Sequence, residues 1–237
     1  MTVMTRRLDQ GSDAGPGSRT ARAAAALTVT LGAATVCWVV AVDQMRGMNL
    51  GVATRLGSFA FFAGSWITMM AAMMLPGAVP AVLRRTDGSR RVLAGPVFAT
   101  SYLAVWAAVG LAVYWLYRPH GTVAAGVVVM VAGVYELTPV KRHFRLQCRD
   151  NAQSGLVFGL DCVGSSLGLM AMLIVLGVMS VTWMAAIAIV VVAQKLLAAR
   201  VVVDVPLALA IIGFGVAILA APSAVPGLLP AGAMPTM

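Results

Sequence analysis

Charged residues are scarce in this sequence. Of its 237 residues, 11% are charged and 60% are hydrophobic, whereas a soluble domain is about one quarter charged and about half apolar. The apolar stretches run from residue 23 to residue 222 with only short breaks. The composition therefore excludes a soluble domain that carries a single membrane anchor, and it predicts a chain embedded in a lipid bilayer.

Soluble catalytic motifs are missing as well. The chain has no phosphate-binding loop, no HExxH and no GxSxG, and it has no internal repeat of the kind that marks inverted-repeat transporters. Its three cysteines, Cys37, Cys148 and Cys162, form neither a CxxC pair nor a secreted disulfide framework. The basic residues that give the net charge of +9 lie between the apolar segments. This placement indicates membrane topology rather than a surface that binds nucleic acid. We therefore expect no enzyme and no nucleic-acid partner.

Seven apolar segments approach the roughly 20 residues that a helix needs to cross the hydrocarbon core. Because unsatisfied backbone is expensive in lipid, each of them is expected to be a helix. The predicted fold is an all-α polytopic transmembrane bundle over 23–222, with a disordered cytoplasmic tail at 1–22 and a flexible tail at 223–237. The expected spans are 23–43, 57–83, 94–117, 122–141, 156–179, 182–199 and 204–222, with a very short turn between the fifth and the sixth.

Basic residues predict the orientation. With the N-terminus inside, fourteen of the 17 basic residues fall in cytoplasmic segments, which is the usual asymmetry of membrane proteins. The inner set is Arg6, Arg7, Arg19, Arg22, Arg84, Arg85, Arg90, Arg91, Lys141, Arg142, Arg145, Arg149, Lys195 and Arg200, and the outer set is Arg46, Arg55 and Arg118. The preference for arginine over lysine, with many Ala and Val residues, is typical of a GC-rich bacterium. We expect a multi-pass protein of the bacterial cytoplasmic (inner) membrane.

A methionine-rich segment lies in the second span. Met69 and Met73, and likewise Met70 and Met74, are four residues apart, so the four thioethers form one broad helix face. Thioethers are soft donors that suit Cu(I). Methionine is also an adaptable packing residue in apolar cores. The segment can therefore be interpreted either as a metal-binding face or as a packing face.

An acidic residue lies inside the fourth span. Glu136 is about five residues from the cytoplasmic end of its helix, and an intramembrane carboxylate indicates either function or a structural ion pair. Its candidate partners are Lys141 and Lys195. Lys195 follows Gln194 at the inner end of the sixth span, where it can also extend to the membrane surface. Cys148 is expected near that surface.

The fifth span carries a polar stripe. Asp161 and Ser165 are four residues apart, as are Cys162 and Ser166, so they share one side of the helix. The serines are expected to hydrogen-bond to carbonyls of their own helix or to neighbouring helices. Asp161 and Cys162 together are harder to explain by packing alone.

These segments resemble a family of bacterial membrane proteins of unknown function, described as predicted metal-binding integral membrane proteins, some of which are labelled copper chaperones. The resemblance covers about Trp66 to Lys195. Its motifs are WITMMAAMMLP at 66–76, YELTPVK at 135–141, the pair Cys148-Arg149 and GVMSVTWMA at 177–185, in that order. The resemblance implies a helical membrane fold and metal binding.

The chain departs from the family at its thiols. The family typically has a cysteine at or beside Phe144 and a Cys-Cys-Trp run where this chain has Ser165, Ser166 and Leu167. The family also typically has Gln at the position of Glu136 and Glu at the position of Gln194. A cluster of five thiols is thus reduced here to Cys148 and Cys162. Two thiolates, or one thiolate with thioethers, still suit Cu(I), whereas a tetrahedral zinc site requires four good ligands.

Three functions remain open. The first is the binding or handling of a soft metal such as copper. The second is a non-metal accessory or scaffold subunit, supported by the serine replacements, which would bind a membrane-protein partner or form a homo-oligomer in the bilayer. The third is a proton-coupled carrier that uses the two intramembrane acids. The proposed ligands are Cys148, Cys162, Met70, Met73 and Met74, and the other intramembrane polar residues are Glu136, Asp161, Ser165, Ser166 and Lys195.

Overall fold

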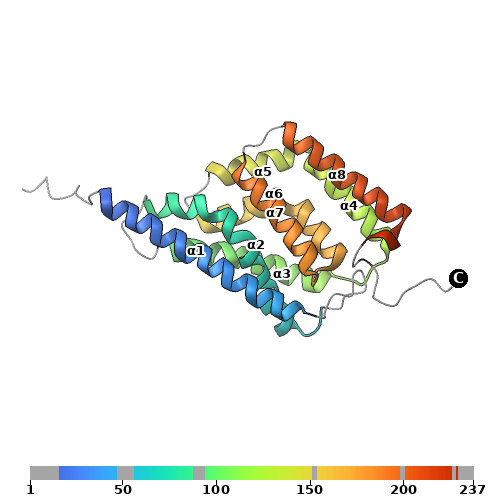
Figure 1. The fold of residues 1–237 in the computed structure, drawn as a ribbon, viewed down its shortest axis with the longest axis horizontal. Helices are drawn as coiled ribbons and strands as arrows, with labels where there is room; N and C mark the ends of the chain where they lie inside the picture. Colours follow the sequence, from blue (N-terminus) through green and yellow to red (C-terminus); the bar gives the residue numbers. More distant parts are fainter. Residues whose placement is uncertain are drawn as a thin grey trace, which may run out of the picture.

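The computed structural model describes residues 16–46, 56–87, 94–150, 154–197, 201–225 and 228. Within these residues the fold is all-α, with no strand, as the sequence predicts (Figure 1). The helices are α1 Pro16–Met45, α2 Phe59–Asp87, α3 Ala94–Leu116, α4 Thr122–Glu136, α5 Pro139–Asp150, α6 Gly155–Gly177, α7 Val181–Leu196 and α8 Val201–Ala220, followed by the short 3-10 helix η2 Pro222–Ala224.

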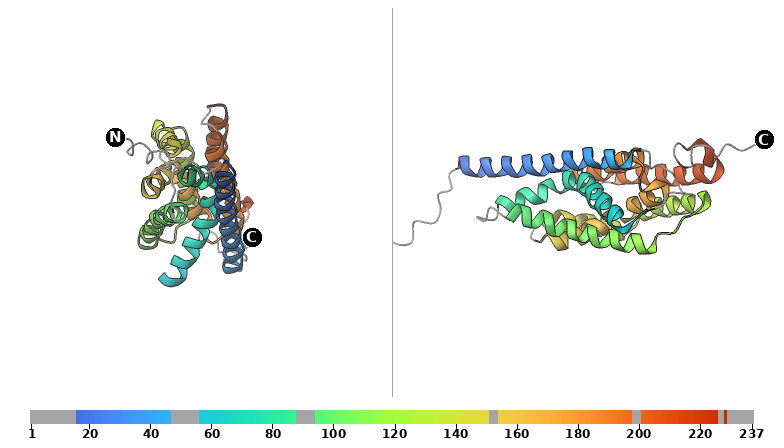
Figure 2. Two further views of the ribbon diagram at one scale, coloured as in Figure 1. Left: turned by 90° about the vertical axis from the view of Figure 1, so that its left-hand side faces the viewer. Right: turned by 90° about the horizontal axis from the view of Figure 1, so that it is seen from below.

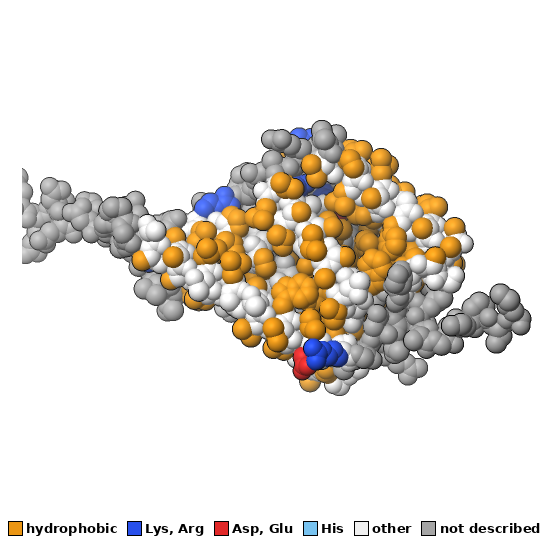
Figure 3. Space-filling view, in the orientation of Figure 1, with side chains coloured by type: hydrophobic (Ala, Val, Ile, Leu, Met, Phe, Trp, Pro, Cys, Tyr) orange, Lys and Arg blue, Asp and Glu red, His pale blue; other side chains and the backbone are white. Residues whose placement is uncertain are grey.

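Each of the seven expected apolar segments contains a helix. Helices α1, α2, α3, α6 and α8 are long and apolar enough to cross a membrane. The bent pair α4 and α5 makes a sixth span if it is counted as one, and α7 is apolar but shorter. Hydrophobic side chains cover most of the face seen in Figure 3, and the charged side chains on that face lie toward its edges.

Helices α2 and α6 form the centre of the bundle. Helix α2 contacts α1, α3 and α7, and helix α6 contacts α3, α4, α5 and α7. Helix α8 packs on α4, while the long α1 lies along one side of the molecule (Figure 2). The methionine-rich segment and the polar stripe of the fifth expected span are therefore carried by these two central helices.

The ends of the chain only partly overlap the described residues. Helix α1 begins at Pro16, so it includes the last residues of the expected tail at 1–22, whose first fifteen residues lie outside the described part. Most of the expected tail at 223–237 lies outside it too. The same holds for six of the basic residues used to predict orientation, namely Arg6, Arg7, Arg55, Arg90, Arg91 and Arg200.

The fourth expected span is interrupted, which corrects the prediction of one helix over 122–141. Helix α4 ends at Glu136, and the chain turns by 66° into α5. The Thr138 hydroxyl accepts from the Lys141 backbone N–H at 3.3 Å, and Pro139 occupies the first position of α5. A threonine cap followed by proline starts a new helix, since proline has no N–H to continue the previous one. The basic segment between the fourth and fifth expected spans is this helix.

The fifth and sixth expected spans are separate helices. Helix α6 ends at Gly177, whose φ of 134° lies in a region that L side chains rarely adopt. The Ser180 side chain then caps α7 by accepting from the Trp183 backbone N–H. The predicted short turn is thus confirmed, with its centre at 178–180.

Glycines allow α6 to approach three neighbours closely. A Cβ on Gly159 would lie 2.8 Å from Val105 Cγ2 of α3, and one on Gly164 would lie 2.5 Å from the Phe144 ring of α5. A Cβ on Gly168 would lie 3.1 Å from the Ala132 carbonyl oxygen of α4. Small residues that let helix backbones approach are the usual packing device within membranes. They also bring α5 against α6, which positions the two buried thiols.

Candidate metal site

The two thiols that the sequence singles out come together between α5 and α6. Cys162 is completely buried and Cys148 is 8% exposed. Their side chains are close enough to interact electrostatically, although they are fourteen positions apart in the chain. Cys148 Sγ also donates to the Phe158 carbonyl oxygen at 3.7 Å. Both cysteines are free thiols.

A lysine from α7 joins these thiols to α2 and α3. Lys195 Nζ donates to Cys162 Sγ at 2.8 Å, to the Tyr102 hydroxyl at 3.2 Å and to Met74 Sδ at 3.8 Å. The ammonium also lies 5.7 Å from the centre of the Tyr102 ring and 5.9 Å from that of Phe158, within the range of cation–π attraction. Lys195 therefore points into the bundle and does not simply extend to the membrane surface.

The aliphatic part of Lys195 passes over a glycine. A Cβ on Gly77 of α2 would lie 2.5 Å from Lys195 Cδ, which is too close for real atoms. Glycine at this position gives the lysine stem room to reach the thiols. Gly77 is therefore part of the site through the space it leaves open.

The methionines of α2 are all enclosed. Met69 is 1% exposed, and Met70, Met73 and Met74 are fully buried. Met74 provides the sulfur beside Lys195, and Met70 lies one turn away on the same helix face. Met73 is turned by about 100° around the helix from Met74. The predicted thioether face is thus buried, and Lys195 Nζ contacts both Met74 Sδ and Cys162 Sγ.

Tyr102 belongs to the site and was not among the sequence candidates. Its side chain is fully buried, and its hydroxyl lies 3.1 Å from Cys162 Sγ. The available signal was a tyrosine in the middle of an apolar span, because a buried tyrosine hydroxyl usually requires a hydrogen-bond partner. The sequence offered no means of choosing that partner.

The polar stripe of α6 lies on the buried side of the helix. Ser165 Oγ donates to the Cys162 carbonyl oxygen at 2.9 Å, and Ser166 Oγ donates to the same oxygen at 2.5 Å. The expectation that the serines bond to their own helix is confirmed. Asp161 is 5% exposed and lies within electrostatic reach of Cys148.

Glu136 lies in a second network. Its carboxylate forms an ion pair with Lys141, and the two side chains are 1% and 3% exposed respectively. Gln194 donates to Glu136 Oε2 at 2.7 Å and accepts from Lys141 Nζ at 3.0 Å. Of the two lysines considered from the sequence, Lys141 is thus the partner. This contact is the one that a structural ion pair requires, and no described hydrogen bond joins Glu136 directly to the thiols.

Arg145 ties this network to α8. Its Nε donates to the Gln194 carbonyl oxygen at 2.9 Å, and its Nη1 pairs with Asp204 Oδ1 at 2.6 Å. Gln194 and Lys195 are adjacent in α7, so one turn of that helix serves both networks. The ion-pair network therefore fixes the end of α7 from which Lys195 reaches the thiols.

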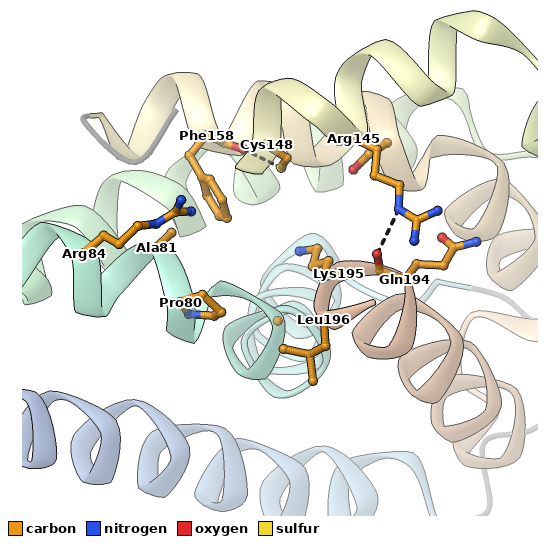
Figure 4. Close-up of a pocket in the computed structure, with 11 residues that line it drawn as sticks. Pro80, Ala81, Arg84, Arg145, Cys148, Phe158, Gln194, Lys195 and Leu196 are labelled. Carbon is orange, nitrogen blue, oxygen red and sulfur yellow. Dashed lines mark hydrogen bonds between the residues drawn. The ribbon is translucent and has the colours of Figure 1, made fainter. Parts of the chain in front are cut away.

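A cavity of about 310 Å³ opens beside the thiols. Figure 4 shows Cys148, Lys195 and Arg84 on different walls of this cavity, carried by α5, α7 and α2. Cys162 does not line it and is completely buried. A molecule in the cavity would therefore meet Cys148 before Cys162.

The donor set has the character that a soft ion prefers. It comprises two thiols and one thioether, with an ammonium beside them. Within the described ranges no group of three or more His, Cys, Asp and Glu side chains could hold a metal ion. Thiolate and thioether ligands select Cu(I), while structural zinc takes four N, S or O ligands. The residues present thus fit a soft monovalent ion of low coordination number.

Comparison with known proteins gives one finding. The PpoB2 family model, described as copper chaperone, matches residues 63–218, more than half of the chain. The matched stretch contains both buried thiols and Lys195. The resemblance drawn from the sequence motifs to a family labelled copper chaperone is thereby confirmed. Searches among curated proteins and among solved structures give no match.

Proposed function

Because the chain belongs to the PpoB2 family, described as copper chaperone, we propose that it binds Cu(I) within a membrane-embedded helical bundle and passes it on. The observation that carries this proposal is the meeting of Cys148 and Cys162 in a buried site beside a cavity. The role is a non-enzymatic one, in which the ion is cargo.

Cys148 and Cys162 are the proposed ligands, with Met74 as the third donor. Two thiolates around one Cu(I) carry a net negative charge of one, and such a charge is costly in an apolar interior unless a cation balances it. Lys195 supplies that cation at 2.8 Å from Cys162 Sγ. Met70 and Met73 extend the soft lining of α2 behind Met74.

We propose seven spans, with the N-terminus in the cytoplasm of a bacterium and the protein in its inner membrane. Under this topology 23–222 is the membrane domain, 1–22 and 223–237 are tails, and the cavity opens toward the cytoplasm. The proposal rests on the excess of basic residues in alternate connections. Reporter fusions after residue 87 and after residue 225 test it. The first is expected to report a cytoplasmic location and the second an external one.

The exposed apolar faces of the bundle are proposed to contact lipid. A copper carrier must also release its ion, so a membrane-protein partner or a second copy of the chain is the proposed recipient. The accessory or scaffold role is what would remain if the site held no metal.

Copper loading tests the proposed function directly. Purified protein is incubated with excess Cu(I) under reducing conditions, desalted, and analysed for bound copper. Wild type is expected to retain about one ion per chain, while Cys162→Ala and Cys148→Ala lose most of it. Cys37→Ala is the matched control, because Cys37 is a half-buried thiol on α1, outside the site. Equal copper in all four proteins, or none in wild type, would overturn the proposal.

A further inference from the structure

A second group of sulfur atoms lies away from the thiols. A small void is found where the end of α1, the first half of α2 and the turn between α6 and α7 meet. Three of its described lining residues are methionines, and none of them is charged. The lining consists of Met45, Phe62, Ser65, Trp66, Met69, Val178 and Met179. Thioethers from three segments that are far apart in the sequence therefore surround one space.

Each of these methionines is buried at its own place in the fold. Met45 is the last residue of α1 and is buried, although Asp43 and Arg46 on either side of it are exposed. Met69 lies on α2, Met179 lies in the turn between α6 and α7, and none of the three methionines is more than 3% exposed. Their side chains thus point into the bundle and not toward lipid.

The void is dry. It has no room for a water molecule, whose radius is about 1.4 Å. This excludes a hydrated cation and an organic ligand. A bare monovalent metal ion is smaller than water, and methionine side chains are flexible enough to close on it. Thioethers are soft ligands that select Cu(I) rather than the hard cations that prefer oxygen.

Ser65 gives an independent indication of a ligand. It is 1% exposed and lines the void, and its hydroxyl has no hydrogen-bond partner among the described residues. Thr68, three residues further along α2, instead donates to a carbonyl of its own helix, the Gly64 oxygen, at 2.8 Å. Because a buried hydroxyl without a partner costs free energy, packing of the methionines leaves Ser65 unexplained. A cation in the void would meet the lone pairs of this oxygen.

Two aromatic rings complete the lining. Trp66 Nε1 donates to the Trp106 carbonyl oxygen at 2.9 Å, which fixes the indole. The centre of the Phe62 ring lies 5.6 Å from that of Trp66. Aromatic rings attract cations, and tryptophan does so most strongly. This attraction would offset part of the cost of a buried positive charge that three uncharged sulfur atoms do not balance.

We infer that Met45, Met69 and Met179 form a second Cu(I) site, separate from the thiols and on the other half of α2. The ion binds to three uncharged thioethers, so no proton is released and copper stays in the monovalent state. This inference goes beyond the proposed function, because the second site needs neither Cys148 nor Cys162.

The methionines of α2 connect the two sites. Met74 lies beside Lys195 at the thiols and Met69 lines the void, five residues or about 7.5 Å away along the helix axis. Met70 and Met73 lie between them and are fully buried. Under the proposed topology the second site lies toward the outer side of the membrane. It is therefore placed to receive an ion that leaves the thiols.

The test uses a variant without thiols, in which Cys37, Cys148 and Cys162 are all replaced by alanine. The purified variant is dialysed to equilibrium against buffered Cu(I) under reducing conditions. Desalting is avoided, because uncharged sulfur attracts a cation less strongly than a thiolate does. We expect about one bound ion per chain with sulfur neighbours in its X-ray absorption spectrum. Lowering the pH from about 8 to about 5 should not release it, whereas thiolate sites lose metal as they are protonated.

Leucine variants in the same thiol-free protein locate the site. Met45→Leu, Met69→Leu and Met179→Leu remove one sulfur each and keep a similar side-chain volume. Each is expected to lower the affinity for Cu(I) by at least about tenfold, since one of three soft donors is lost. Met184→Leu is the matched control, because Met184 is a fully buried methionine of α7 that does not line the void. Equal affinities in Met69→Leu and Met184→Leu would overturn the inference.

The chain with its thiols intact provides a second measurement. After dialysis, wild type is expected to hold one more ion than it keeps after desalting, and Met69→Leu is expected to lose only that additional ion. No additional ion in wild type would overturn the second site, whether or not the thiols hold copper. Copper that depends on Met69 but not on Cys148 or Cys162 would support the second site and contradict the proposed function.

Discussion

The Lys195 ammonium lies 2.8 Å from Cys162 Sγ and 3.8 Å from Met74 Sδ, so one cation joins donors from α6 and α2. The lysine reaches them across a glycine and is fixed at its base by the Gln194 network. A partly buried ammonium beside two thiols has a clear electrostatic consequence when those thiols bind a metal ion as thiolates.

Replacing this ammonium is expected to weaken copper binding. In Lys195→Met, the negative charge of a two-thiolate Cu(I) complex is no longer balanced within the bundle. We expect the affinity for Cu(I) to fall at least tenfold, or about 1.4 kcal/mol, as measured by competition with a chromophoric Cu(I) chelator. Arg85→Gln removes an equal charge from an exposed site and should leave the affinity unchanged. Unchanged or tighter binding in Lys195→Met would contradict the charge-balancing role.

Gly77 and Gly64 allow a matched test of the space around Lys195. Both lie within α2, but a Cβ on Gly77 would meet Lys195 Cδ at 2.5 Å, while one on Gly64 would have no described atom within 4 Å. Gly77→Ala is expected to displace the lysine and weaken Cu(I) binding in the same direction as Lys195→Met, by a smaller factor. Gly64→Ala is expected to keep wild-type affinity and to gain roughly 0.5–1 kcal/mol of stability. Equal affinities in the two variants would show that the lysine needs no such space.

The sequence was sufficient for most of the fold because membrane insertion depends on composition. Every expected apolar segment contains a helix. The break after Glu136 was missed because residues 122–141 were interpreted as one continuous span, although Thr138 and Pro139 together form a helix start. Caps of this kind are local signals and can be found in sequence.

The site was only partly predictable for a different reason. Cys148, Cys162 and Met74 were named as candidates because sulfur is chemically distinctive in an apolar helix. Their meeting depends on which helix faces which, and spacing within one helix carries no such information. Tyr102 and the inward direction of Lys195 depend on the same tertiary contacts.

The α4–α8 contact offers a stability test that is separate from metal binding. A Cβ on Gly215 would lie 2.8 Å from the Met130 backbone nitrogen, whereas one on Gly213 would have no described atom within 4 Å. Gly215→Ala is expected to lower stability by about 1–3 kcal/mol through overpacking, seen as a lower melting temperature in detergent. Gly213→Ala should not destabilise the protein. If both variants melt alike, α4 and α8 do not pack as closely as described.

Mutations of the buried ion pair between Glu136 and Lys141 can distinguish a structural role of this pair from a role in a proton-coupled carrier. Removing one member leaves the other charge unbalanced in the bundle, so Glu136→Ala and Lys141→Met are each expected to cost roughly 3–5 kcal/mol of stability. The double variant should lose less than the sum of the two, since it leaves no unpaired charge from this pair. Thermal unfolding of all four proteins measures this coupling. Strictly additive losses would show that the pair is not energetically coupled.

A proton-dependent flux lost in Glu136→Gln would instead assign the carboxylate to an ion path, because glutamine keeps the hydrogen-bonding shape but cannot exchange a proton.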